Sequence, residues 1–338
     1  MAKKEIHYFI NTIGSQGQYS FYDSNFSGLK RIIPLSCYPE RVVRQLVETA
    51  SEHAAKKGYR TEILHDFLTN GMEGIIIPEA ETGLINYPGY REQDYNLLHI
   101  LDDTNTSDAK KQLKEAQRHF SDALKTHDDW EKIYIENMDF STLNDLTEAT
   151  IERVVGNSQT GQAGRGYDRF LGAATADGSV DYIENITDTL SKRYFIKGRP
   201  GTGKSTFMRK IAEKAIANGY IVEIYHCSFD PNSLDMIVIR DLDVCLFDST
   251  APHEYFPSRS TDEIIDIYET AVKSGTDEKY AAELFTVSTD YKFKVMAARK
   301  CLAKARDCFE KTEAYHSAKI DRNKLSQIQS NILGLLLP

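Results

Sequence analysis

Short apolar runs alternate with longer amphipathic stretches along the chain, and this alternation predicts an α/β fold. The runs also recur in the same order. At an offset of 161 or 162 residues, segment 58–65 corresponds to 219–226, 75–77 to 237–239, and 84–86 to 246–248. Matches that keep one register over such a span indicate a tandem duplication, although convergent strand and helix patterning would produce the apolar part of the match.

Each set of strands is followed by a long helical pattern with apolar residues at spacings of three and four. The first seam consists of Leu113, Ala116, Phe120, Ala123, His127, Trp130 and Tyr134, and the second, 182 residues later, of Val295, Ala298, Leu302, Ala305, Phe309, Thr312 and His316. A second helical arm follows each seam. We expect His127 and His316 to be packed core or rim residues rather than ligands. Packing of one hairpin on the other, within the chain or between chains, is the natural use of such seams.

The predicted organisation is two α/β domains, each followed by a helical hairpin. The first domain spans 1–155 with its hairpin at about 105–154, and the second spans 168–338 with its hairpin at about 290–337. Residues 156–167 are rich in glycine and polar residues, which predicts a flexible, exposed linker. The larger offset of the helices shows that the second copy carries 20 more residues after Asp248.

The second copy contains a glycine-rich loop suited to phosphate. A short apolar strand at 193–197 runs into the sequence GRPGTGKST, and an amphipathic helix follows. Glycines allow the backbone to curl so that several N–H groups point at an anion, and the helix N-terminus adds partial positive charge. The spacing G-x-x-x-x-G-K-S in this setting predicts a nucleotide-phosphate site made of Gly198, Pro200, Gly201, Thr202, Gly203, Lys204, Ser205 and Thr206.

Roles within this site follow from the residue types. Lys204 supplies a point charge to the β- and γ-phosphates, and the Ser205 hydroxyl is a ligand for Mg²⁺. The apolar run Val244–Asp248 predicts a buried strand that ends in a carboxylate. In a parallel sheet its carboxyl end would open beside the loop, so that Asp248 would hold Mg²⁺ through water. Taken alone, Asp248 could equally be a solvated turn carboxylate.

On these residues the chain resembles the P-loop NTPase superfamily. More narrowly, it is similar to an uncharacterised bacterial family of duplicated P-loop ATPases. That likeness rests on Lys197–Thr206, Tyr225–Ser228, Asn232–Asp235 and Leu246–His253. The resemblance covers nearly the whole chain. It implies a duplicated parallel-sheet domain of P-loop type and ATPase activity with ATP and Mg²⁺ as cofactors, but it names no substrate.

The first copy departs from this pattern. Its corresponding segment, 34–44, contains no glycine for the curl and no lysine at the phosphate position, and Asn86 stands where the second copy has Asp248. We therefore expect the first copy to be a structural or regulatory partner that does not bind Mg-ATP.

Hydrolysis also requires a group that orients water and added positive charge near the γ-phosphate. The candidates for the water are Asp230 and Glu254, with His253 as a further one, each weighed against a solvent-facing loop residue. We expect His226, at the end of an apolar run, to be buried and hydrogen-bonded. The candidates for the charge are Arg199, Arg259, and Arg41 or Arg44 of the first copy, although those two are better explained as solvated arginines on the first turns of a helix.

Two other classes of function stay open. A kinase would use 227–235 and the added residues after Asp248 as an acceptor pocket, but the chain lacks an arginine-rich lid. A nucleotide-gated switch would bind ATP tightly, turn over slowly and reorient its hairpins. ATP is the expected nucleotide because no Asn-Lys-x-Asp stretch, the guanine-reading motif, is present.

Composition narrows the partners and the compartment. Hydrophobic residues make up 41% and charged residues 27%, as in globular proteins, and the net charge of −9 argues against a broad nucleic-acid grip. The N-terminus lacks the apolar run of a signal peptide, and no window approaches the ~20 apolar residues of a membrane span. Five scattered cysteines fit reduced thiols. We expect a cytoplasmic protein without a membrane partner, with protein contacts or self-association through the hairpins.

Overall fold

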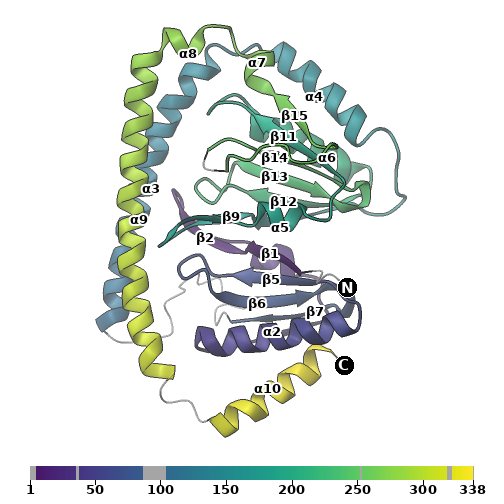
Figure 1. Cartoon of the computed structure of the whole chain (residues 1–338), viewed down its shortest axis with the longest axis vertical. Helices are drawn as coiled ribbons and strands as arrows, with labels where there is room; N and C mark the ends of the chain where they lie inside the picture. Colours follow the sequence, from purple (N-terminus) through teal and green to yellow (C-terminus); the bar gives the residue numbers. More distant parts are fainter. Residues whose placement is uncertain (1–4, 36–37, 87–103, 252, 318–321, 338) are drawn as a thin grey trace.

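A computed structural model of the chain describes residues 5–35, 38–86, 104–251, 253–317 and 322–337. It is an α/β protein built on one eleven-stranded sheet in the order β15-β11-β14-β13-β12-β8-β1-β5-β6-β7-β4. Two long helices cross one end of the strands, and shorter helices cover the faces of the sheet (Figure 1). The α/β class predicted from the alternating pattern is confirmed.

The strands fall into two sets with the same order. From the middle of the sheet outward, the first set is β1 (Glu5–Phe9), β5 (Thr61–His65), β6 (Met72–Ile77), β7 (Thr82–Ile85) and β4 (Arg31–Pro34). The second is β8 (Arg165–Phe170), β12 (Ile221–His226), β13 (Leu234–Ile239), β14 (Val244–Asp248) and β11 (Lys192–Lys197), with β15 (Glu263–Asp266) added at the edge. The sets meet where β1 and β8 pair antiparallel, with Phe9 opposite Phe170.

The sheet is mixed, so the expectation of parallel-sheet domains was wrong. β5, β6 and β7 pair antiparallel, as do β12, β13 and β14. The cause lies in the short connections, because parallel neighbours need a crossover of about a dozen residues or more. Only the 3₁₀ turn η1 (Pro78–Ala80) joins β6 to β7, and only η2 (Arg240–Leu242) joins β13 to β14, each closed by one left-handed residue. β11 does pair parallel with both β14 and β15.

Each set of strands carries the same smaller elements. Hairpins β2 (Asn11–Gly14)/β3 (Gly17–Ser20) and β9 (Gly172–Thr175)/β10 (Gly178–Asp181) follow the two central strands. The helices are α1 (Tyr22–Phe26), α2 (Glu40–Lys56), α3 (Thr104–Ile135) and α4 (Phe140–Val154) in the first half, and α5 (Ile183–Thr187), α6 (Lys204–Ala217), α7 (Ile267–Ala271), α8 (Thr276–Lys279), α9 (Ala281–Ser317) and α10 (Arg322–Leu336) in the second.

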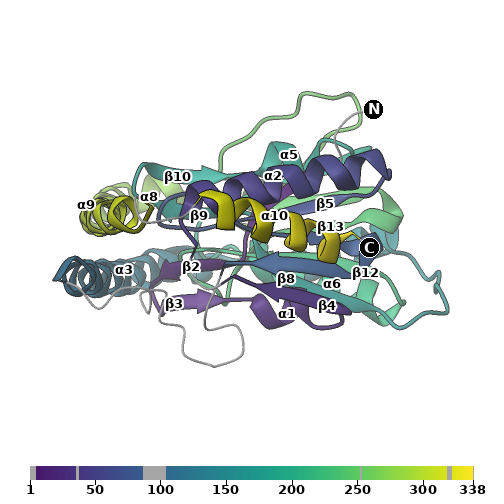
Figure 2. The same ribbon diagram turned by 90° about the horizontal axis from the view of Figure 1, so that it is seen from below.

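The two predicted seams pack against each other within the chain. α3 and α9 run side by side, as both views show (Figure 1, Figure 2). Leu113, Ala116 and Phe120 of the first seam share a buried cluster with Ala298, Leu302 and Ala305 of the second. The side chain of His316 lies outside the described residues.

The second arm of each helical hairpin packs on the other half of the molecule. Leu143 of α4 belongs to the core that contains Phe207 and Met208 of α6. Reciprocally, Ile332 and Leu336 of α10 are buried with the apolar face of α2. The segments 1–155 and 168–338 therefore each contribute one helix to the core of the other.

The segment expected as a linker is exposed, but it is fastened to the second half. Thr160 of the segment donates to backbone carbonyls just after α6, and the Asn218 side chain there donates to backbone carbonyls of the segment. These four hydrogen bonds measure 2.8–3.1 Å. A Cβ at Gly164 would lie 2.0 Å from the Ile216 carbonyl oxygen, so only glycine fits there. β8 begins at Arg165, and the connection ends three residues earlier than expected.

A buried charged cluster joins the halves at the centre of the sheet. Arg169 of β8 lies 2.7 Å from Glu62 of β5 and 3.4 Å from Glu223 of β12, two glutamates at equivalent places in the repeat. Burial by itself would raise the pKa of Glu223, but the charges of Arg169 and Arg240 outweigh it and hold that pKa at about 2.

Candidate functional site

The glycine-rich loop curls tightly between β11 and α6. Gly201 and Gly203 have φ values of 77° and 83°, which side-chain-bearing residues rarely adopt. A Cβ at Gly198 would lie 2.5 Å from Thr202 Oγ1, and that hydroxyl donates to the Arg199 carbonyl at 2.8 Å. The loop therefore has the strand–curl–helix form predicted from its sequence.

Lys204 and Asp248 meet at this loop. Lys204 Nζ donates to the Arg199 carbonyl at 2.9 Å and lies 3.6 Å from Asp248 Oδ2. Because β14 pairs parallel with β11, with Asp248 opposite Ile196, the carboxylate emerges beside the start of the loop. The structure thus brings together the lysine and the carboxylate that the sequence singled out.

The chemistry of Ser205 and Asp248 suits Mg²⁺, a hard cation that prefers oxygen ligands. The Ser205 hydroxyl accepts the Leu234 N–H at 2.9 Å, which leaves a second lone pair for a metal. One oxygen of Asp248 accepts from the Thr250 N–H and hydroxyl, whereas the other faces Lys204. Thr206 is exposed on the first turn of α6, and Pro200 lies half-buried in the loop.

A second carboxylate, Asp235, was missed as a candidate. Met236 of β13 pairs with Phe247 of β14, so Asp235, one residue earlier, is level with Asp248 at the end of the antiparallel pair. Burial raises the pKa of Asp235 to about 6, and the charge of Asp248 adds to the rise. Recognition of β13 and β14 as a hairpin would have revealed this pair, because hairpin register sets which residues face each other.

His253 lies against this carboxylate rather than facing open solvent. Its Nδ1 is 2.9 Å from Asp181 and its Nε2 is 3.9 Å from Asp235. Burial lowers the pKa of His253, but the two aspartates outweigh that effect and raise it. An imidazole that is held in this way favours its charged form.

The other candidates for orienting water differ in their placement. Asp230 accepts hydrogen bonds from the Ser233 hydroxyl and the Gln16 amide, both at 3.2 Å, and its charge reaches His127 on α3. Glu254 is exposed in the stretch after β14. His226 is hydrogen-bonded, as expected, but only half-buried, with one ring nitrogen 2.9 Å from Asp168 and the other 2.6 Å from the Pro231 carbonyl.

Arg199 and Arg259, two of the arginines predicted to add positive charge near the γ-phosphate, contact other groups. Arg199 pairs with Asp277 at 2.9 Å and stacks 4.8 Å over the Tyr268 ring. Arg259 donates to the Leu190 carbonyl, before the start of β11 and therefore at the opposite end of that strand.

Arg41 and Arg44 are remote from the loop because they lie on α2. That helix covers β5 and β6, and six strand spacings of about 4.8 Å separate β5 from β11, roughly 29 Å in all. Arg44 instead pairs with Glu40, one turn away. The expectation of an arginine supplied by the first half was wrong for these two residues.

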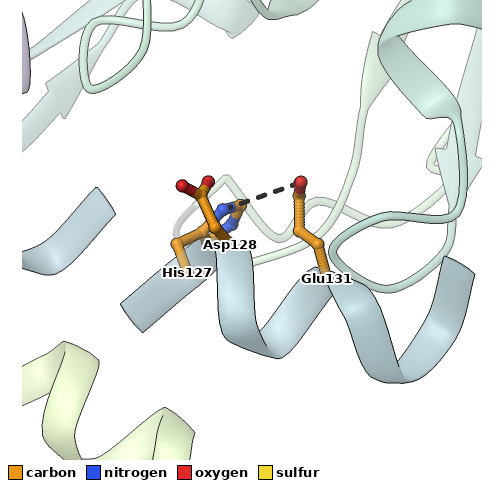
Figure 3. Close-up of side chains that lie close together, drawn as sticks. All are labelled: His127, Asp128 and Glu131. Carbon is orange, nitrogen blue, oxygen red and sulfur yellow. Dashed lines mark ion pairs between the residues drawn. The ribbon is translucent and has the colours of Figure 1, made fainter. Parts of the chain in front are cut away.

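The first half contributes residues of α3 to the surroundings of the loop. Figure 3 shows the His127 imidazole and the Glu131 carboxylate facing each other on this helix, and an ion-pair contact of 3.6 Å joins them. Burial lowers the pKa of His127, and the charge of Lys204 lowers it further. With Asp128, the ligand atoms of these side chains lie within 4.8 Å of one another, so the three can reach a single cation.

In the first half, the side chain of Asn86 binds the backbone of the corresponding loop. The Asn86 amide donates to the Tyr38 carbonyl and accepts the Tyr38 N–H, both at 2.8 Å. Asn86 stands where the second half has Asp248. Residues 36 and 37 of this loop lie outside the described residues.

No protein-family model matches the chain, and no curated protein or solved structure matches it either. Among the described residues, no helix is both long enough and apolar enough to cross a bilayer.

Proposed function

We propose that this protein binds Mg-ATP at the loop 198–206 and hydrolyses the terminal phosphate. The observation that carries the proposal is the position of Lys204, 3.6 Å from Asp248, above a loop that two left-handed glycines curl. A lysine and a strand-end carboxylate beside a curled glycine loop are what a nucleoside triphosphate and its metal require.

Each residue has a defined task in this proposal. Lys204 neutralises charge on the β- and γ-phosphates, and the loop N–H groups hold their oxygens. Ser205 and Asp248 hold the metal, which when bound polarises the phosphate. Water attacks the γ-phosphorus, the bond to the β-bridging oxygen breaks, and ADP leaves with phosphate. Asp235, which is level with Asp248, and Asp230, in the turn between β12 and β13, are the carboxylates that we assign to orient that water, whereas Glu254 is exposed.

The first half acts as a structural or regulatory partner that does not bind Mg-ATP. The reciprocal Asn86–Tyr38 hydrogen bonds and the missing lysine support this assignment. We also infer that the halves descend from one duplicated unit, since strand order, hairpins and helices recur at the offsets of the sequence repeat. A cytoplasmic location fits the free thiols of Cys227, Cys245, Cys301 and Cys308. Self-association or a protein partner through the helices stays a proposal.

The test is phosphate release with Mg²⁺ and ATP, comparing the wild type with Lys204→Ala. Lys214→Ala, on the last turn of the same helix, is the matched control. We expect release by the wild type and the control and a loss of at least a hundredfold in Lys204→Ala. Tight binding without release would instead favour the switch or the kinase, and a screen for a phosphorylated acceptor would separate those two.

A further inference from the structure

Glu131 of α3 packs directly against the phosphate loop of the other half. A Cβ built on Gly201 would lie 2.6 Å from the Glu131 carbonyl oxygen and 2.9 Å from its Cα. Burial raises the pKa of the Glu131 carboxyl, and the Lys204 charge and the Gly201 backbone oppose that rise, so both groups lie near enough to act on this carboxyl. A half-buried carboxyl group thus lies beside two of the groups that the loop offers to an anion.

A bound triphosphate needs the same donors. Loop N–H groups and the lysine at the helix start are the groups that phosphate oxygens contact. The lysine of such a loop reaches the β- and γ-phosphates, so the oxygens that compete with Glu131 belong to the terminal phosphates. Two anions cannot share these donors without strong repulsion.

The same contact occurs in the half that lacks the lysine. Glu313 of α9 follows Glu131 by 182 residues, and Gly201 follows Glu40 by 161, which are the offsets of the repeat. The Glu40 N–H donates to the Glu313 carboxylate. Each long helix thus contacts the loop of the other half through an equivalent glutamate: α3 through Glu131 and α9 through Glu313. The contact also occurs at the loop that lacks the lysine.

We propose that Glu131 is a latch on the phosphate loop, which a nucleoside triphosphate must displace from Gly201 and Lys204 in order to bind. This inference rests on the proposed function, because it names the regulation of the same site. Displacement removes one contact between α3 and the second half, while Glu313 still contacts the loop of the first half from α9. Nucleotide occupancy is thereby coupled to the position of the α3–α9 pair.

Binding measurements test the latch. ATP and ADP are titrated with Mg²⁺ into the wild type, Glu131→Gln and Glu313→Gln. Removal of the competing charge in Glu131→Gln should tighten ATP binding about tenfold and ADP binding less. Glu313→Gln, the equivalent change at the other loop, should leave both affinities unchanged.

The movement has its own probe, because Trp130 is the only tryptophan of the chain. Its ring lies next to Glu131 and packs 6.1 Å from Tyr291 and 6.3 Å from His127. ATP should change the Trp130 emission of the wild type, and nucleotide-free Glu131→Gln should already resemble the ATP-bound state.

The outcomes separate the two claims. If the wild type binds ATP but Glu131→Gln binds it no tighter, the latch is wrong and the proposed function stands. Reduced turnover with unchanged affinity in Glu131→Gln would likewise overturn the latch, in favour of a catalytic role for Glu131. If no variant binds nucleotide, both claims fail together.

Discussion

Lys204 Nζ lies 3.6 Å from Asp248 Oδ2, although 44 residues separate them in the chain. The parallel pairing of β11 with β14 creates this proximity, because it brings the carboxyl ends of both strands to one edge of the sheet. In the first half, the same position holds Asn86, whose amide is committed to the backbone of its own loop. This difference between the halves underlies the prediction of a single nucleotide site.

Replacement of Asp248 by asparagine should weaken the binding of Mg²⁺ that accompanies the nucleotide. The amide keeps the size of the side chain but loses the charge that attracts a divalent cation. We expect the half-saturating Mg²⁺ concentration to rise about tenfold or more in a titration at fixed ATP. Asp241→Asn, an exposed change in the turn before β14, is the control and should behave like the wild type. An unchanged Mg²⁺ requirement in Asp248→Asn would remove Asp248 from the metal site.

Alanine at Gly201 should be more harmful than alanine at another left-handed glycine. Gly201 and Gly275 have φ values of 77° and 81°, so both substitutions carry the same backbone strain of about 1 kcal/mol. At Gly275 nothing lies within 4 Å of an added Cβ, whereas at Gly201 the Glu131 backbone lies within 2.6 Å. Gly201→Ala should therefore lower both stability and ATP affinity below the values for Gly275→Ala. Equal behaviour of the two variants would contradict the close contact between α3 and the loop.

Arg169 should be essential to stability because it lies between two buried glutamates of different halves. Arg169→Met leaves Glu62 and Glu223 without their shared partner, and such a loss costs about 3–5 kcal/mol in a buried cluster. Chemical denaturation measures this cost. Arg153→Met, which breaks the more exposed pair with Glu263, is the comparison and should cost less than about 1 kcal/mol. Similar losses of unfolding free energy in both variants would show that the central cluster is not the main electrostatic contribution to stability.

The stability of the protein should fall in acid through Glu223. Its pKa is about 2 in the folded protein, below the ordinary value of 4.5, so the folded state favours the ionised form. The resulting stabilisation is present above pH 4.5 and is lost as the pH falls toward 2, by about 3 kcal/mol. Glu223→Gln should flatten the pH profile of the unfolding free energy over this range, and exposed Glu213→Gln should leave it unchanged. A profile that stays as steep in Glu223→Gln would assign the acid sensitivity to other groups.

Local chemistry explains which features the sequence could predict. The loop 198–206, the strand ending at Asp248 and the seams of α3 and α9 depend on residue types at short spacing, and the structure contains all of them. The repeat also placed equivalent strands correctly, since each pair occupies the same position in its half of the sheet.

Long-range packing determines the features that the sequence did not predict. The antiparallel pairing of β13 with β14 depends on a three-residue turn, and the parallel expectation therefore overlooked Asp235. The exchange of α4 and α10 between halves is set by which apolar faces meet, and spacing along the chain does not encode that choice. Glu131 was overlooked for the same reason, although its recurrence as Glu313 at the offset of the helical seams was a usable signal.

The most direct test of the central claim is the number of Mg-ATP molecules bound per chain, measured by calorimetry or equilibrium dialysis at saturation. We expect one nucleotide per chain in the wild type and none in Lys204→Ala. Two nucleotides per chain would contradict the assignment of the first half, and binding that survives in Lys204→Ala would contradict the assignment of the loop.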